Sequence, residues 1–202
     1  MTQLEQTNLQ YQEQGFCFSP VLFEEESIAQ AIGHQDLVAS GQYETGIAPR
    51  NPFDPSVGPP GKMVKIDSSH RADLTIRQFV SNPALGEWAA AITGARWVQI
   101  WAVQLLIKPG LGAHETKVGW HQDRDHWGFW EEESELFTAW VALTDVSDDC
   151  GPMIYQRGSH KWGFLDQGNF FDTTHDSFQD TINAPEGSRC EAVPVLLKAG
   201  QV

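Results

Sequence analysis

The sequence has 202 residues, of which 41% are hydrophobic, and a formal net charge of −14 from 13 Lys and Arg against 27 Asp and Glu. This length and hydrophobic content fit one domain with a sizeable core and exclude a disordered chain. An acidic chain repels phosphate backbones, so we expect no nucleic-acid partner, and a polyanionic substrate such as a coenzyme A thioester is mildly disfavoured.

The cysteine pattern and the N-terminal stretch bear on location. The three cysteines are far apart and form no Cys-x-x-Cys pair, and the polar start has no apolar segment typical of a signal peptide. We therefore expect reduced thiols and a cytoplasmic protein. No apolar run is long enough to span a membrane.

The N-terminal half is predicted to be mainly helical. Residues 15–18 read as a short strand, and residues 24–40 as a helix whose leading glutamates suit its positive end. Residues 44–61 are rich in Pro and Gly and are predicted to form a loop that could act as a lid. Helices are expected over 72–80 and over 82–94, the second with an Asn N-cap, a Pro at the first position and a closing Gly.

The C-terminal half changes character. Strands are predicted over 96–108, 136–146, 152–156 and 190–197, from β-branched and aromatic residues bounded by turn signals. Residues 163–187 show no clear period and are expected to be a surface excursion. Helices first and strands afterwards favour an α+β, mainly β fold with a sandwich or barrel core in one domain spanning 1–202.

A cluster of possible metal ligands lies in GWHQDRDHWGFW, residues 119–130. In a strand, His121 and Asp123 would project from one face, with Gln122 turned away. One further His would complete the 2-His-1-carboxylate facial triad of non-haem Fe(II) enzymes. Alone, His-x-Asp is a weak signal, and the alternative is a hydrogen-bonded surface pair at a strand end.

The motifs around this cluster make the signal more specific. From about residue 60 onward, the sequence resembles the phytanoyl-CoA dioxygenase family of Fe(II)/2-oxoglutarate-dependent oxygenases. The matching stretches are WAVQLLIKPG (101–110), GWHQDRDHWGF (119–129), FTAWVALTDVSDDCGPM (137–153), QRGSHKWG (156–163) and VPVLLKAGQV (193–202).

The resemblance implies a double-stranded β-helix, or jelly-roll, cupin-like core with N-terminal helices packed against it. It implies His121 and Asp123 as iron ligands, with 2-oxoglutarate as cosubstrate and O₂ as oxidant. Gln104 matches the position that hydrogen-bonds 2-oxoglutarate, and a buried amide there would need such a partner. Trp140 matches an aromatic residue that packs on the cosubstrate, and Lys65 aligns loosely with a basic residue near it.

The second metal histidine of the family follows the strand that 193–202 resembles. We therefore expect the third ligand and the final jelly-roll strands after Val202, and expect residues 1–202 alone to be inactive. Four histidines are possible substitutes for the third ligand. His126 lies too near the motif, His160 fits a structural role in a turn, His175 lies in the long excursion, and His114 lies on the loop before the motif and could reach the site or the substrate.

Residues flanking the motif are candidates for a substrate pocket. For the aromatic ones, core packing or a stiffened loop is an equally good interpretation, and a solvated or ion-paired side chain is the simpler interpretation of the arginine. The candidates are His114, Trp120, Arg124, Trp127 and Phe129.

The favoured function is an Fe(II)/2-oxoglutarate-dependent dioxygenase that hydroxylates a small organic substrate. Halogenases of this superfamily carry a small residue in place of the carboxylate, so Asp123 favours hydroxylation. The alternatives are a non-catalytic jelly-roll binding protein and a cupin-like enzyme that uses another metal with His114 or His126. Neither the substrate nor an oligomeric state can be read from these residues.

Overall fold

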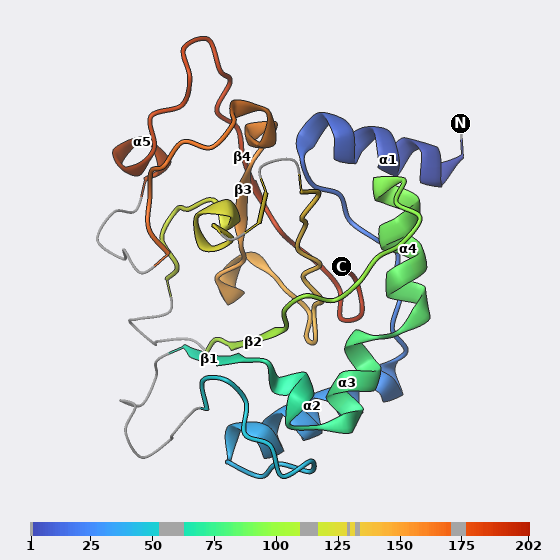
Figure 1. The fold of residues 1–202 in the computed structure, drawn as a ribbon. Coiled ribbons are helices and arrows are strands. Elements are labelled where there is room, and N and C mark those ends of the chain that lie inside the picture. The colour runs from blue at the N-terminus through green and yellow to red at the C-terminus, as the bar shows by residue number, and fades with distance from the viewer. Residues whose placement is uncertain (1, 53–62, 110–116, 129, 132–133, 171–176) are drawn as a thin grey trace.

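Helices occupy the N-terminal half of the chain, and mostly extended segments occupy the C-terminal half (Figure 1). This order agrees with the sequence prediction. The structure is a computed structural model, and it describes residues 2–52, 63–109, 117–128, 130–131, 134–170 and 177–202.

The helix ends follow local capping chemistry. The helices are α1 (Gln3–Gln14), α2 (Glu25–Ala39), α3 (Leu74–Val80), α4 (Pro83–Thr93) and the short α5 (Phe178–Thr181). As predicted, Asn82 accepts a hydrogen bond from the Ala84 amide, and Gly94 ends α4 with φ 74°. The sequence had not predicted α1, although Thr2 and Glu5 form a capping box at its start.

Two small antiparallel sheets organise the extended segments. β1 (Val64–Asp67) pairs with β2 (Gln104–Ile107), and Ile66 lies opposite Leu105. β3 (Ile154–Gln156) pairs with β4 (Ala192–Pro194). Short 3₁₀ turns connect other segments, at Ser69–Arg71, Asp123–His126, Asp148–Cys150 and Ser159–Trp162.

The predicted strands were too long. Within 96–108 the strand covers Gln104–Ile107, residues 136–146 contribute one isolated bridge from Val146 to Leu197, and residues 15–18 form no strand. A β-prone run forms a regular strand only where a neighbour supplies a hydrogen-bond ladder. Among the described residues, none forms a ladder with 96–103, and Trp97 there is 86% exposed.

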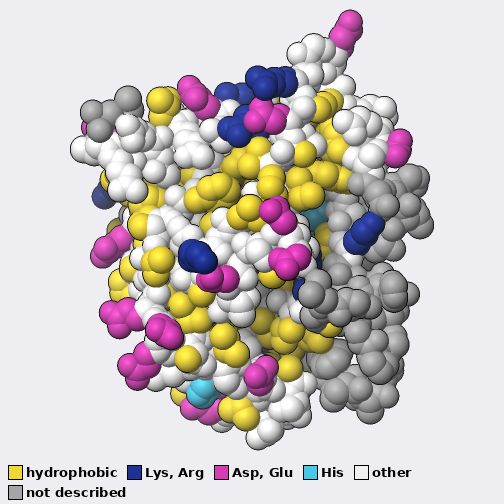
Figure 2. Space-filling view, turned by 180° about the vertical axis from the view of Figure 1, so that it is seen from behind, with side chains coloured by type: hydrophobic (Ala, Val, Ile, Leu, Met, Phe, Trp, Pro, Cys, Tyr) yellow, Lys and Arg dark blue, Asp and Glu magenta, His cyan; other side chains and the backbone are white. Residues whose placement is uncertain are grey.

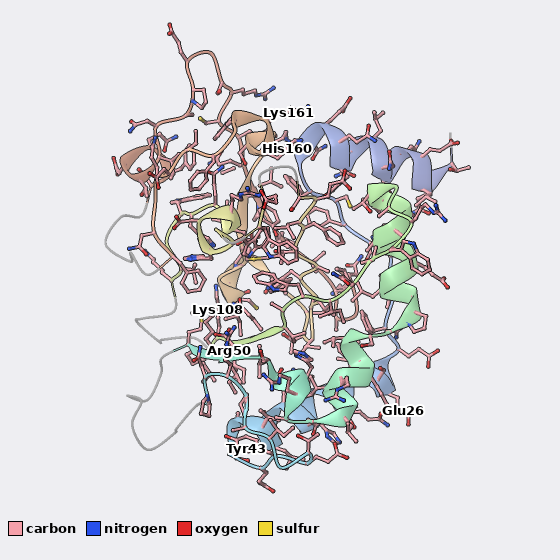
Figure 3. All side chains as sticks on the ribbon, viewed as in Figure 1. Glu26, Tyr43, Arg50, Lys108, His160 and Lys161 are labelled. Atoms are coloured by element: carbon pink, nitrogen blue, oxygen red, sulfur yellow. The ribbon has the colours of Figure 1, made fainter. Side chains whose placement is uncertain are left out.

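Two predicted irregular segments are described in part. Residues 44–52 of the proposed lid form turns, and Arg50 lies beside the β1–β2 sheet (Figure 3). Its backbone amide donates to the Asp67 carbonyl at 2.8 Å. The rest of that loop, from residue 53, lies outside the described residues. The excursion 163–187 contains α5, and its residues 171–176 also lie outside.

The buried apolar side chains form three clusters. One joins α2, α3 and the β1–β2 sheet, and a second lies between α2 and α3, where the rings of Phe23 and Phe79 stack 4.4 Å apart. The third, here called the C-terminal cluster, consists of Ala142, Val195 and Leu197. The helices therefore pack on one face of the β1–β2 sheet and leave its other face turned away from them.

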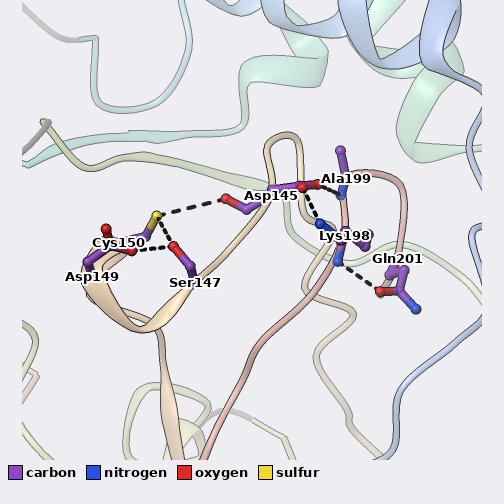
Figure 4. Close-up of polar contacts among 7 residues, drawn as sticks. All are labelled: Asp145, Ser147, Asp149, Cys150, Lys198, Ala199 and Gln201. Atoms are coloured by element: carbon purple, nitrogen blue, oxygen red, sulfur yellow. Dashed lines mark hydrogen bonds and ion pairs between the residues drawn. The ribbon is translucent and has the colours of Figure 1, made fainter.

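Residues 197–202 connect both halves of the chain. Val202 exchanges hydrogen bonds with Ser19, each 2.8 Å, and Gly200 donates to the Ala142 carbonyl at 2.8 Å. Asp145 accepts from the Lys198 ammonium at 2.6 Å and from the Ala199 amide at 2.9 Å (Figure 4).

The surface shows the acidic balance of the sequence. Figure 2 shows Asp and Glu side chains scattered over one face, with Lys and Arg gathered in a few places. None of the helices among the described residues is long and apolar enough to cross a membrane.

The thiols are predicted to differ in reactivity. All three are unpaired, and Cys150 and Cys190 are exposed, whereas burial raises the pKa of Cys17 to about 11. A higher pKa reduces the thiolate fraction at pH 7 but raises the nucleophilicity of that thiolate, and the net effect is roughly a tenfold slower reaction. Reaction with Ellman's reagent at pH 7 should show two fast equivalents and one slow one. Cys17→Ser should remove the slow phase, and three equally fast thiols would contradict the prediction.

Candidate metal centre

His121 and Asp123 lie side by side, although residues 121–126 do not form a strand. Asp123 begins the 3₁₀ turn Asp123–His126, and this turn, rather than strand alternation, brings its carboxylate back toward the imidazole. His121 Nε2 lies 3.4 Å from Asp123 Oδ1. The predicted pair is therefore adjacent, but the predicted geometry was wrong.

The donor atoms fit a divalent metal. His121 Nδ1 lies 2.8 Å from the Gly119 carbonyl oxygen, which can accept only if Nδ1 carries the proton. The lone pair of Nε2 then faces Asp123, as in metal sites where the second ring nitrogen is anchored to backbone. Metal–ligand bonds of about 2.1 Å place neighbouring octahedral ligands about 3 Å apart, close to the separation seen here.

The same contacts set the protonation of the pair. Thr138 Oγ1 donates to Asp123 Oδ2 at 2.7 Å. Burial acts to raise the pKa of Asp123, but hydrogen bonds from His121 and Thr138 and the charge of His121 lower it overall. Burial acts to lower the pKa of His121, but its hydrogen bonds to Asp123 and Gly119 and the nearby carboxylates raise it overall. A proton and a metal ion would therefore compete for the same pair.

A third protein ligand is not found in the part of the chain that the structure describes, where no further His, Cys, Asp or Glu ligand atom joins the pair within 4.8 Å. The ring of His126 is 6.0 Å from that of His121. His160 lies against the end of α1 and contacts the Gln12 carbonyl at 3.0 Å, a structural position (Figure 3). His114 and His175 lie outside the described residues.

The β1–β2 sheet presents the predicted cosubstrate residues on one face. Ile66 and Leu105 are buried against the helices, so the alternate side chains Lys65 and Gln104 point to the opposite face. Gln104 is exposed, so the expectation of a buried amide was wrong. Adjacent residues of a strand point to opposite faces, so only one of Gln104 and Leu105 can face the helices. Leu105 is the one that does.

Lys65 lies close to the candidate ligands. Its ammonium nitrogen is 5.2 Å from the centre of the Phe170 ring, and that ring meets the His121 imidazole edge-on at 5.1 Å between centroids. A 3.7 Å ion pair with Asp67 also engages Lys65. The structure thus brings Lys65 and His121 close to the same phenyl ring.

Trp140 does not lie on the β1–β2 sheet with Lys65 and Gln104. It is half-buried and packs against the C-terminal cluster together with Tyr155. Burial, with a contribution from the charge of Asp123, raises the pKa of Tyr155 to about 12, so its hydroxyl is neutral over the physiological range. Tyr155 was not among the predicted site residues, since a Tyr in a short strand gives no distinctive signal.

The predicted pocket residues separate into groups. Trp127 and Trp130 both meet Trp101 in edge-to-face contacts, with ring centroids 6.2 and 5.8 Å apart. Arg124 directs its guanidinium to the Trp130 carbonyl at 3.5 Å, which favours a structural interpretation. Phe129 lies outside the described residues. The three indoles form an aromatic wall beside the motif, assembled from two segments of the chain.

Trp120 packs edge-to-face on Phe178, with ring centroids 5.1 Å apart. Both line a cavity of about 100 Å³ that also touches His121 and Gln156. Gln156 is 7% exposed, and its amide oxygen has no hydrogen-bond partner. A buried amide oxygen of this kind is commonly satisfied by an ordered water.

A second group of possible ligands lies far from the motif in sequence. His34, Glu44 and Asp73 place ligand atoms within 4.8 Å of one another beside a surface hollow of about 340 Å³. Their polar atoms already serve the fold: His34 pairs with Asp73 at 2.7 Å, and Glu44 accepts from the Leu74 amide at 2.8 Å. His34 and Asp73 are 39 residues apart in the sequence, so no local pattern identifies this pair.

Known proteins resemble this chain in sequence and in fold. The sequence model described as "Phytanoyl-CoA dioxygenase (PhyH)" matches residues 11–202. SnoK, a non-heme alpha ketoglutarate dependent carbocyclase from nogalamycin biosynthesis, matches with a TM-score of 0.62 and 21% identity over 100% of this chain and 72% of its own. The epimerase SnoN from the same biosynthesis matches with a TM-score of 0.60 and 18% identity over 98% and 70%.

A second SnoN structure, in complex with Fe3+, alpha ketoglutarate and nogalamycin RO, matches with a TM-score of 0.61 and 18% identity over 98% of this chain and 72% of its own. No curated protein matches the sequence. At these identities the structural likeness shows a shared fold, consistent with the predicted jelly-roll core.

Proposed function

We propose that this chain, which belongs to the phytanoyl-CoA dioxygenase family, is an Fe(II)/2-oxoglutarate-dependent oxygenase that hydroxylates a small organic substrate. The observation that carries the proposal is the adjacency of His121 Nε2 and Asp123 Oδ1, with His121 Nδ1 anchored on backbone. Two such ligands form one edge of a facial triad and leave positions for cosubstrate and O₂. The similar SnoN structure, described with Fe3+ and alpha ketoglutarate, supports this choice of cofactors.

In this proposal His121 and Asp123 hold the iron, and a third protein ligand comes from outside the described residues. The Gly119 carbonyl orients the imidazole, and Thr138 orients the carboxylate. Such outer contacts fix the tautomer and the direction of each ligand.

Lys65 and Gln104 are proposed to bind 2-oxoglutarate, since they share the sheet face turned away from the helices. The ammonium of Lys65 supplies a positive charge for a carboxylate in an otherwise acidic protein, and the Gln104 amide supplies a donor. Trp140 is proposed to pack on the cosubstrate. The bound centre supplies the coupled conversion of 2-oxoglutarate and O₂ to succinate and CO₂, with the second oxygen atom going to the substrate.

The aromatic wall of Trp101, Trp127 and Trp130 is proposed to contact the substrate and exclude water. The net charge of −14 favours a neutral or cationic small molecule over a polyanion. Hydroxylation is preferred to halogenation because the carboxylate of Asp123 occupies the position that a halide would need.

The test is succinate formation by the purified full-length protein with Fe(II), 2-oxoglutarate and a panel of small neutral and cationic organic compounds. Substrate-dependent succinate, with an oxygen atom from ¹⁸O₂ in the product, is the expected result. Product formed without 2-oxoglutarate would contradict the proposal.

The second candidate is a non-catalytic jelly-roll binding protein. It is favoured by one observation, namely that the described residues supply two ligands to the centre and no third. Calorimetric titration with Fe(II) under nitrogen separates the two, because a binding protein without an iron site gives no saturable metal binding.

A further inference from the structure

A segment distant in sequence lies along the motif. The Gly119 amide donates to the Phe170 carbonyl at 3.1 Å, and the Asn169 amide donates to the Trp120 carbonyl at 2.9 Å. Residue numbers rise in one segment as they fall in the other, so the two run antiparallel. Residues 163–170, here called the backing segment, therefore support the motif from the start of the long excursion.

The side chain of Gln122 forms hydrogen bonds with the N-terminal end of the backing segment. Its Nε2 donates to the Gly163 carbonyl at 2.8 Å, and its Oε1 accepts from the Leu165 amide at 2.8 Å. Both ends of one amide are thus engaged by the backbone of the backing segment. The side chain of the residue between the two candidate ligands is therefore occupied in holding this segment.

Gly168 shows how closely the two segments approach. It has φ +84°, and a Cβ placed there would lie 2.1 Å from the Trp120 carbonyl oxygen. A side chain at this position would force the backing segment away from the motif.

The backing segment also reaches the imidazole. Phe170, at its end, meets His121 edge-on with ring centroids 5.1 Å apart. The backing segment therefore holds the motif on both sides of His121. It binds the backbone of Gly119 and Trp120 before the histidine and the side-chain amide of Gln122 after it.

We propose that Gln122 is a positioning residue, which holds the backing segment against the motif so that His121 and Asp123 keep the spacing needed to bind metal. The inference rests on the proposed function. The described residues of the motif form no strand, so their geometry depends on contacts of this kind rather than on a sheet.

The test is a titration of the metal-free protein with Co(II), a spectroscopic substitute for Fe(II), followed by its visible absorption. Gln122→Met keeps the length of the side chain and removes both hydrogen bonds, and it should weaken Co(II) binding about tenfold and change the absorption bands. Gln122→Glu keeps the acceptor for Leu165 and loses the donor to Gly163, so an intermediate loss is expected.

Gln167→Met is the matched control. Gln167 lies in the same backing segment and accepts a backbone hydrogen bond, from Asn183 at 2.7 Å, on a segment other than the motif. Its Co(II) affinity and spectrum should equal those of the wild type. Urea unfolding of each variant shows whether it is folded, and if Gln122→Met is not, Gln122→Glu decides.

Wild-type affinity and spectrum in the folded Gln122 variants would overturn the inference and leave the proposed function standing. An equal loss in Gln167→Met would also overturn it, because the effect would then belong to the excursion as a whole. Absence of saturable Co(II) binding by the wild type would overturn the proposed function itself.

Discussion

Replacing Asp123 with Ala is expected to lower substrate-dependent succinate formation by more than about 100-fold. Loss of a residue that merely supports a metal ligand costs roughly 10- to 100-fold, and loss of a ligand should cost more. The carboxylate is also the group that His121 Nε2 faces at 3.4 Å, so its removal leaves the imidazole without its partner. Metal content by mass spectrometry should fall together with turnover.

Asp125→Ala is the control for this variant. Asp125 lies in the same 3₁₀ turn and is exposed, and it acts on His121 only through its charge. Turnover close to the wild-type value is expected there. Full turnover in folded Asp123→Ala would remove Asp123 from the ligand set.

Replacing Asp73 with Ala is expected to reduce the free energy of unfolding by about 3 kcal/mol, because two interactions of a buried carboxylate are lost together. Asp73 is 1% exposed. Its Oδ1 accepts the Ile76 amide at 2.9 Å as the N-cap of α3, and its Oδ2 pairs with His34 at 2.7 Å. The cap contributes about 1 kcal/mol and the charged hydrogen bond about 2 kcal/mol.

Urea unfolding followed by circular dichroism measures this loss. Asp36→Ala removes an exposed aspartate from α2 and should change stability by less than about 0.5 kcal/mol. A loss below about 1 kcal/mol in Asp73→Ala would show that His34 and the α3 amide find equivalent partners in water.

Features that depend on residues close together in the sequence were predicted well. The caps of α4 at Asn82 and Gly94 follow from chemistry within a few positions, and both appear as predicted. The strands were less predictable, because a ladder requires a partner that local sequence does not identify. Thus 136–146 has the composition of a strand but contributes one bridge.

The candidate site shows the same division. The closeness of His121 and Asp123 was predictable from a two-residue spacing, although a turn rather than a strand produces it. The partners of Gln122 lie 41 and 43 residues further along the chain, so no local pattern identifies them. Likewise, the contact between Asp73 and His34 joins residues 39 positions apart and is visible only in three dimensions.

The hydrogen bonds between Ser19 and Val202 have a consequence for the order of folding. They join residues 183 positions apart, so the N-terminal segment after α1 cannot take its final place during synthesis until nearly every residue described here has left the ribosome. Closing so long a loop costs entropy before any contact repays it, which places this step late and makes it slow. Until then, the apolar side chains that residues 197–202 cover remain exposed and can be bound by chaperones. The order of synthesis therefore determines when this part of the core is completed.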